Sequence, residues 1–283
     1  MPVPPSCPAL AVSAVIVDYH MHLRNPAEEV EHTLEAVERF LETAAERGVD
    51  EIGFSEHVYY FRQTFEIWDV QYQIERCVYD LDAYCDVVLD AKQRGLPVKL
   101  GLEVDYVDAR QQRLAELIAG YPWDYLLGSV HWIDGLAIDQ EPGLWAEHSV
   151  EEVWRRYVGA VSELAGGDAV DVLAHADLAK IFRRLPEPAV LAELHDELAE
   201  AAARAGVAVE ISTAGLHKPV GELYPDPALL RACVQRGVPI TIASDAHVPA
   251  LVGRDFDLAL AREAGCETVT VFEGRQARQE QLG

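Results

Sequence analysis

A short phrase recurs five times along the chain: a stretch with helical hydrophobic spacing ends at a glycine and passes at once into a β-rich run. It appears as ERGVDEIGFS, QRGLPVKLGLEV, RAGVAVEIS, QRGVPITIAS and EAGCETVTVF. A glycine in this place suits the left-handed backbone just past a helix. Helix therefore alternates with strand, which predicts parallel strands joined by right-handed helical crossovers, in a (β/α) barrel or a doubly wound sheet.

Nothing in the sequence divides the chain into separate parts. Its 283 residues, half of them hydrophobic, can bury one large core or two smaller ones. No linker rich in proline, glycine and serine interrupts the alternation. We therefore expect one domain over residues 1–283, with residues 1–12 as an N-terminal tail. The run ETVTVF would be an eighth strand, and its periodicity alone does not place it inside or outside a barrel.

Nearly every apolar strand stops at a residue type that binds metals. The first ends at His20 and His22, which share one face of an extended chain, although such a pair alone is more often a hydrogen-bonded strand end. The later strand ends carry Glu56, His57, Glu103, Asp105, His131, His175, Glu210, Ser212, Asp245 and His247. An open sheet concentrates ligands at its switch point, so contributions from seven strands favour a barrel with the site at the C-terminal ends of its strands.

This set of imidazoles and carboxylates exceeds what one tetrahedral ion needs. Imidazole suits zinc, iron and similar metals, and carboxylates can bridge two ions. The sequence therefore points to two or three divalent transition-metal ions, zinc, iron or manganese, and to metal-assisted hydrolysis. His148 and His217 fall outside the strand-end pattern. His32 and His195 lie in helical stretches and are expected to be solvated surface residues.

Charge and composition exclude several other classes of protein. The chain has 23 Lys and Arg against 48 Asp and Glu, a formal charge of -25, which would repel a nucleic-acid backbone. It has no apolar run of about 18 residues and no basic N-terminal region, so we expect neither a membrane span nor an export signal and place the chain in the cytoplasm. Five scattered cysteines form no C-x-x-C pair and are expected to be reduced packing residues. The oligomeric state is left open.

Six ordered motifs, DYHMH, GFSEH, GLEVDY, GSVHWIDG, LAHADLAK and ASDAH, resemble the PHP superfamily of metal-dependent phosphoesterases. More narrowly, they resemble its histidinol-phosphate phosphatases, over residues 15–272. The resemblance implies a distorted (β/α)7 barrel of the PHP type with a trinuclear metal centre. It also implies that a metal-bridging hydroxide hydrolyses a small-molecule phosphate ester, L-histidinol phosphate, to L-histidinol and phosphate in histidine biosynthesis.

The resemblance also implies three metal positions on this chain. The first ion is held by two histidines and two carboxylates, His20, His22, Glu103 and Asp245. The second shares Glu103 as a bridge and is completed by His131 and His175. The third is held by His57, His247 and a residue in the loop after the first strand, where the matching position is Glu28 and the competitors are Glu29 and His32. Glu103, Asp245 and His247 are the expected catalytic residues.

Basic residues near the strand ends are candidates to bind the phosphate group: Lys180, Arg183, Lys218 and Arg254. The alternative for each is a solvated surface charge. Relatives in the family often carry arginine where this chain has His217, which puts phosphate affinity or substrate choice in question.

Three other functions stay open on the sequence. One is another PHP phosphoesterase that acts on nucleotides or cyclic phosphodiesters. The second is an amidohydrolase-like metallohydrolase, which would release no phosphate and would leave His57 and His247 without a purpose. The third is a vestigial barrel that only binds, and its signature would be the loss of several ligands.

Overall fold

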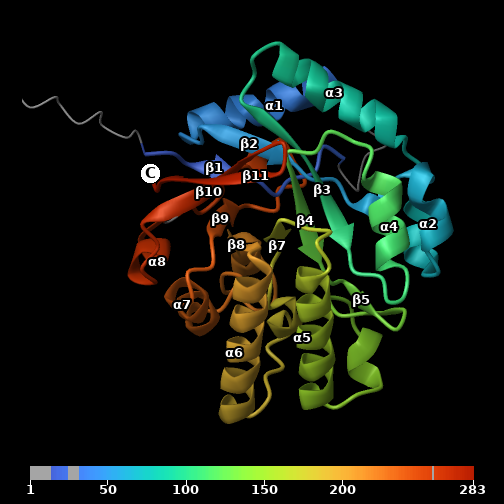
Figure 1. The fold of residues 1–283 in the computed structure, drawn as a ribbon, viewed down its shortest axis with the longest axis vertical. Helices are drawn as coiled ribbons and strands as arrows, with labels where there is room; N and C mark the ends of the chain where they lie inside the picture. Colours follow the sequence, from blue (N-terminus) through green and yellow to red (C-terminus); the bar gives the residue numbers. More distant parts are fainter. Residues whose placement is uncertain (1–13, 25–31, 257) are drawn as a thin grey trace, which may run out of the picture.

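The computed structural model describes residues 14–24, 32–256 and 258–283, and its centre is a sheet of seven parallel strands (Figure 1). In sheet order they are β1 (Val17–Asp18), β2 (Glu51–Phe54), β3 (Val98–Asp105), β4 (Tyr125–Ser129), β7 (Val172–Leu173), β8 (Ala208–Ser212) and β9 (Ile240–Ala243). The sheet curls until its edges approach, because the segments that follow β1 and β9 form a parallel bridge at Met21 and Ala246. The expected seven-stranded (β/α) barrel is confirmed.

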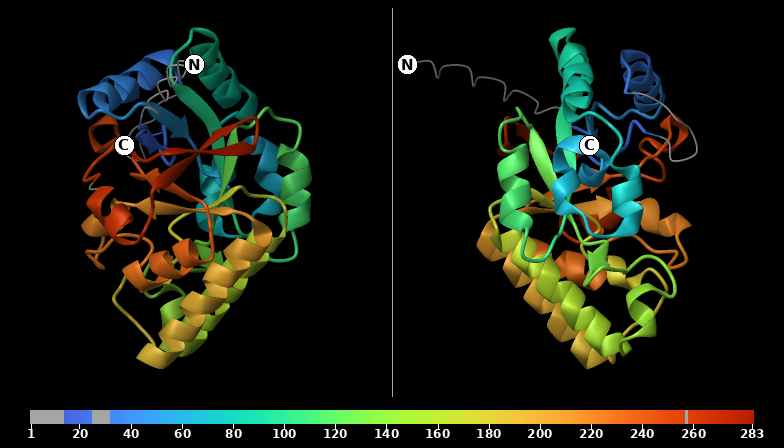
Figure 2. Two further views of the ribbon diagram at one scale, coloured as in Figure 1. Left: turned by 60° about the vertical axis from the view of Figure 1, so that its left-hand side comes forward. Right: turned by 90° about the vertical axis from the view of Figure 1, so that its right-hand side faces the viewer.

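Helices cover the outside of this barrel (Figure 2). They are α1 (Leu34–Glu46), α2 (Gln71–Arg76), α3 (Leu81–Gln93), α4 (Gln111–Ile118), α5 (Val150–Gly166), α6 (Pro188–Ala205), α7 (Pro227–Gln235) and α8 (Leu258–Glu263). Short 3₁₀ turns lie in the connections: η1 (Val58–Tyr60), η2 (Arg62–Ile67), η3 (Gly143–Ala146), η4 (Leu178–Lys180), η5 (Ala214–His217) and η6 (Pro249–Leu251). No helix in the described parts of the chain is long and apolar enough to cross a membrane.

The helix ends follow the local sequence signals. The glycines of the recurring phrase all have a positive φ, between 69° and 95°, namely Gly48, Gly95, Gly206, Gly237 and Gly265. The predicted capping box at the start of α5 is also present, because the Glu152 N–H donates to the Ser149 hydroxyl and the Ser149 N–H donates to the Glu152 carboxylate.

The run ETVTVF lies outside the barrel sheet. It forms β10 (Thr268–Glu273), which pairs antiparallel with β11 (Gln276–Gln281) as a separate two-stranded sheet. Phe272 packs against the rings of Tyr19 and Tyr125, and the Arg275 N–H donates to the Asp124 carbonyl just before β4 begins. The hairpin therefore covers the N-terminal end of the barrel strands, away from the ligand-bearing ends.

Tyr125 fills the barrel interior beneath those ligand-bearing ends. Its hydroxyl donates to the Tyr19 carbonyl at 2.7 Å. A Cβ atom at Gly53 or Gly101 would come within 2.3 Å of the Tyr125 side chain, so the ring fits only because both strands carry glycine there. A second small hairpin, β5 (Trp132–Ile133) with β6 (Leu136–Ala137), lies at the opposite end of the barrel, just after His131.

Candidate metal centre

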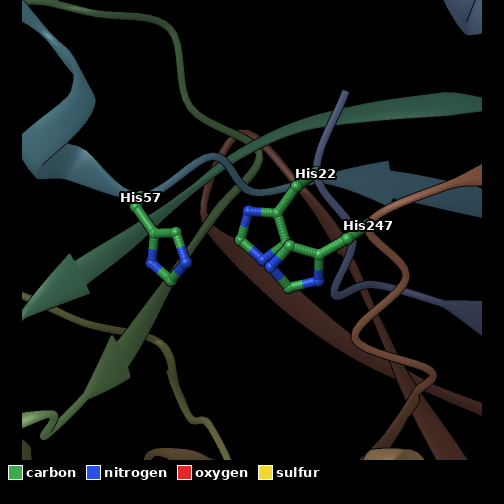
Figure 3. Close-up of side chains that lie close together, drawn as sticks. All are labelled: His22, His57 and His247. Carbon is green, nitrogen blue, oxygen red and sulfur yellow. The ribbon is translucent and has the colours of Figure 1, made fainter. Parts of the chain in front are cut away.

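Three histidines from three separate strand ends point toward one another at the mouth of the barrel (Figure 3). The ring centroids of His22 and His57 are 4.5 Å apart, and those of His22 and His247 are 4.2 Å apart. One ligand nitrogen from each of the three lies within 4.8 Å of the others. The first, second and last barrel strands therefore converge as the strand-end pattern predicted.

The carboxylate of Glu103, on β3, lies at the middle of the cluster and is fully buried. Imidazole nitrogens lie within 3.8 Å of its oxygens, from His20, His22, His57, His131 and His175. Within the described residues none of these contacts has the geometry of a hydrogen bond, although His57 Nδ1 comes within 2.5 Å of Glu103 Oε2. A buried carboxylate without hydrogen bonds is costly unless a cation balances it, so its surroundings suit a bridging metal ligand.

Asp245 is the second carboxylate of the cluster, and it lies beside His20 and His22, the two histidines that follow β1. Its Oδ1 atom lies 3.5 Å from His22 Nε2 and 3.8 Å from His20 Nε2. Asp245 and His175 both have left-handed backbone, with φ of 52° and 28°. This conformation is unfavourable for residues with a Cβ atom, although aspartate and histidine adopt it more readily than most.

Further carboxylates lie behind the imidazoles and face their other ring nitrogens. Glu210 is 3.0 Å from His20 Nδ1 and also accepts the His175 backbone N–H at 2.8 Å. Asp105 is 2.7 Å from His131 Nδ1, and Glu56 is 3.6 Å from His22 Nδ1. Such partners fix the orientation of a metal-binding ring. The sequence pattern had marked these carboxylates only as strand-end polar residues, without this role.

Burial and charge set the protonation of the cluster. Burial lowers the pKa of His57 to about 3, despite the adjacent Glu103, and lowers the pKa of His247 to about 4. Burial alone would raise the pKa of Glu103, but His57 and His20 outweigh it and hold that pKa well below its usual range. Neutral imidazole and ionised carboxylate are the forms that bind metals.

Other histidines hold a proton more tightly. Burial disfavours the charged ring of His20, but Glu210 and Glu103 outweigh it and raise the pKa of His20 well above its usual range. Burial likewise opposes protonation of His131, yet Asp105 raises its pKa to about 10. The carboxylates therefore draw positive charge to the cluster, and protons and metal ions would compete for the same nitrogens.

The donor atoms fit transition metals. Four overlapping groups of three residues have ligand atoms close enough to share an ion: His22, His57 and His247; His20, Glu103 and His175; His20, His22 and Asp245; and His57, Asp105 and His131. Buried atoms in these groups that have no hydrogen-bond partner among the described residues include His20 Nε2, His22 Nε2 and His57 Nδ1. Imidazole nitrogen with carboxylate oxygen is a donor set for zinc, iron or manganese.

Two predicted histidine environments were wrong. The side chain of His32 is only 3% exposed, and its Nε2 atom lies 3.2 Å from a Glu56 oxygen, because His32 precedes α1 and turns inward. His195 is 5% exposed, because it lies on the side of α6 that faces Trp154 of α5. Glu28 and Glu29 lie outside the described residues.

The four basic candidates fall into two groups. Lys218 and Arg254 line a pocket of about 420 Å³ together with Asp245 and His247. Lys180 and Arg183 line a separate cavity of about 310 Å³.

The hydrogen bonds of Lys180 and Arg183 explain why these two side chains lie in the separate cavity. Lys180 is 2% exposed and donates to the Leu223 carbonyl at 2.6 Å, while Arg183 Nε donates to the Val220 carbonyl at 2.9 Å. Both side chains therefore hold the loop after η5, and the structure does not bring them into the pocket beside the cluster.

This barrel, with imidazoles and carboxylates converging from its strand ends, defines a metal-binding enzyme of the (β/α) class. The chain belongs to the PHP domain family, which matches residues 18–214.

Two proteins with similar sequences are named as histidinol-phosphatases. A Deinococcus radiodurans protein named "Probable histidinol-phosphatase" is 36% identical over 181 residues, which cover 62% of this chain and 68% of that protein. The histidinol-phosphatase of Bacillus subtilis is 25% identical over 255 residues, which cover 81% of this chain and 93% of that protein.

A solved structure shares the fold. The crystal structure of a histidinol phosphate phosphatase from Lactococcus lactis, described as a complex with zinc, L-histidinol and phosphate, has a TM-score of 0.72 and 21% identity. The superposition covers 94% of this chain and 100% of the Lactococcus lactis chain.

Proposed function

We propose that this chain is a histidinol-phosphatase, a metal-dependent phosphomonoesterase that hydrolyses L-histidinol phosphate to L-histidinol and phosphate in histidine biosynthesis. The observation that carries the proposal is the buried Glu103 carboxylate, surrounded by imidazoles at the mouth of a PHP barrel. The sequence relatives named histidinol-phosphatase support the choice of substrate.

The proposed centre holds two or three divalent ions, zinc, iron or manganese, with a trinuclear arrangement preferred. Its proposed ligands are His20, His22, Glu28, His57, Glu103, His131, His175, Asp245 and His247. Bound ions would supply the positive charge that activates water and neutralises the phosphate oxygens. Glu103, Asp245 and His247 are the proposed catalytic residues, because they would hold the ions that contact the reacting group.

The remaining residues of the site orient and bind. Glu210 and Asp105 keep the rings of His20 and His131 turned toward Glu103. Lys218 and Arg254 line the same pocket as Asp245 and His247, so they are the groups that would bind the phosphate oxygens. The cytoplasmic location, the single domain and the absence of a nucleic-acid partner stay predictions.

The test is the rate of phosphate release by protein of known metal content. We expect a higher kcat/KM for L-histidinol phosphate than for an aryl phosphate or a nucleotide, because binding of the imidazole and amine helps to position the reacting group. Equal values for all three esters would replace the proposal with a phosphoesterase of broad specificity. No phosphate release by metal-loaded protein would favour the amidohydrolase-like or the binding-only alternative.

A further inference from the structure

Two loops contact each other at the rim of the pocket that is lined by Asp245 and His247. His217 ends η5, which follows β8, and Arg254 lies just after η6, which follows β9. Both residues line this pocket. Asp255, the next residue in the chain, contacts both side chains. The contact therefore joins the last two barrel strands beside two of the proposed metal ligands.

The hydrogen bonds of His217 fix which of its nitrogens carries the proton. A guanidinium has only donors, so Arg254 Nη2, at 2.8 Å, must donate to an unprotonated His217 Nδ1. The other nitrogen, Nε2, lies 2.6 Å from Asp255 Oδ2 and donates its hydrogen to that carboxylate. Asp255 Oδ2 also lies 3.3 Å from Arg254 Nε. His217 therefore links Arg254 to Asp255, and the guanidinium is held at two of its nitrogens.

The backbone that carries Arg254 is anchored independently. The buried carboxylate of Asp18, on β1, accepts the Gly253 N–H at 2.9 Å, and the Thr213 hydroxyl donates to the Arg254 carbonyl at 2.8 Å. Gly253 and Asp255 on either side both have positive φ, 61° and 56°, so the chain turns sharply at Arg254. With the backbone fixed, His217 and Asp255 decide where the guanidinium points.

Stability alone does not account for this cluster. The side chains of His217, Arg254 and Asp255 are 40%, 40% and 47% exposed, and ion pairs this exposed contribute little to folding. An arginine that is already held in one rotamer, by contrast, loses less conformational entropy when it binds an anion. The contacts therefore matter more for binding at the pocket than for the fold.

We propose that His217 and Asp255 are positioning residues that hold the Arg254 guanidinium ready to bind the phosphate group of the substrate. This inference rests on the proposed function and adds to it two residues that do not themselves touch the phosphate. Because His217 acts through Arg254, its contribution exists only while Arg254 is present.

A double-mutant cycle tests this dependence. The variants are His217→Ala, Arg254→Ala and the double variant, in metal-loaded protein, and the measurements are KM for L-histidinol phosphate and the inhibition constant of inorganic phosphate. Arg254→Ala should raise both constants about tenfold, since it removes a charge-assisted contact. His217→Ala should raise both by about threefold to fivefold in the wild-type background, and should change neither in the Arg254→Ala background.

Matched variants distinguish a loss of Arg254 positioning from a general loss of folding or metal binding. His217→Asn, whose amide oxygen can still accept from Arg254, should recover part of the lost affinity. Arg236→Ala, which removes a paired arginine at the end of α7, is the arginine control and should leave both constants unchanged. Arg254→Lys replaces Arg254→Ala if the latter does not fold. Metal content and melting temperature are measured for every variant.

Each outcome decides the inference. Equal effects of His217→Ala in both backgrounds, no effect of His217→Ala, or no effect of Arg254→Ala would each overturn it. If wild-type protein releases no phosphate from L-histidinol phosphate, the proposed function fails instead. The same cycle is then read from calorimetric binding of inorganic phosphate to the metal-loaded protein, where the same pattern supports the inference and additive effects overturn it.

Discussion

His57 and Glu103 lie side by side because the parallel pairing of β2 and β3 continues past the end of β2. The two residues form a parallel bridge, and His57 Nδ1 lies 2.5 Å from Glu103 Oε2. The backbone reinforces this, since the Glu103 N–H donates to the Glu56 carbonyl at 2.9 Å. The strand register of the barrel thus places the central carboxylate beside one of its imidazoles.

The first prediction concerns the carboxylate behind His20. Glu210→Gln should lower metal affinity by about tenfold to a hundredfold, because the neutral amide holds the His20 ring and the His175 backbone N–H less strongly. Metal titration of metal-free protein measures the change. Glu197→Gln, an exposed residue on α6, is the control. Equal affinities for the Glu210 variant and wild type would mean that Glu210 does not support the centre.

A second prediction addresses the loop after the first strand. If Glu28 is a ligand of the third ion, Glu28→Ala should lose about one metal equivalent and at least roughly tenfold in turnover. If it only favours the start of a helix, the variant should lose only a few tenths of a kcal/mol of stability. Glu29→Ala is the matched control. Normal metal content in Glu28→Ala, with a loss in Glu29→Ala or His32→Ala, would reassign the ligand.

Lys180 and Lys218 should respond differently to substitution. Lys180 is buried and lies 3.1 Å from Asp177, so Lys180→Met should lower the free energy of unfolding by about 3 kcal/mol, because it leaves the buried Asp177 carboxylate with the Asp226 N–H but without a cation. Lys218→Ala, at the pocket rim, should raise KM with little change in stability. Denaturant unfolding and initial rates measure the two effects. A stable Lys180→Met variant with a raised KM would return Lys180 to the site.

The sequence was sufficient for the barrel and for the strand ends that converge in it. The glycine-ended helices and the polar strand ends are local signals, and parallel strands bring their ends together whatever the side chains between them. Packing between helices could not be predicted from the sequence in the same way. His195 occupies a helical position that would suit solvent, but its ring lies against Trp154 of α5 and is buried.

Contacts between distant loops were also beyond the sequence. The acceptor for Lys180 is a backbone carbonyl 43 residues away, and His217 meets Arg254 across 37 residues. A backbone carbonyl that accepts a hydrogen bond cannot be recognised from the sequence. The sequence therefore predicts a phosphate ligand at a strand-end lysine even where that lysine donates to a carbonyl, as Lys180 does. The exposed, polar strand β11 gave no β signal either, because its pairing with β10 depends on the backbone rather than on apolar side chains.

Burial of His195 predicts a specific pH dependence of stability. Burial lowers the pKa of His195 below its usual value of 6.5, so the unfolded chain binds the proton more readily than the folded one. Its contribution is therefore present above that usual value and is lost as the pH falls toward the lowered one. His195→Gln should lose less stability than wild type between pH 7 and 5, by at most about 1.4 kcal/mol per pH unit. Parallel curves from denaturant unfolding would contradict this.

The most direct test of the account titrates metal-free protein with zinc or manganese while phosphate release from L-histidinol phosphate is measured. We predict that the rate stays low until more than one equivalent has bound, because Glu103 would bridge ions held by different sets of imidazoles. Glu103→Gln should bind fewer equivalents and lose at least roughly tenfold in rate at saturation, while Glu116→Gln on α4 should match wild type. A full rate at one equivalent or fewer, or an unchanged rate in Glu103→Gln, would contradict the account.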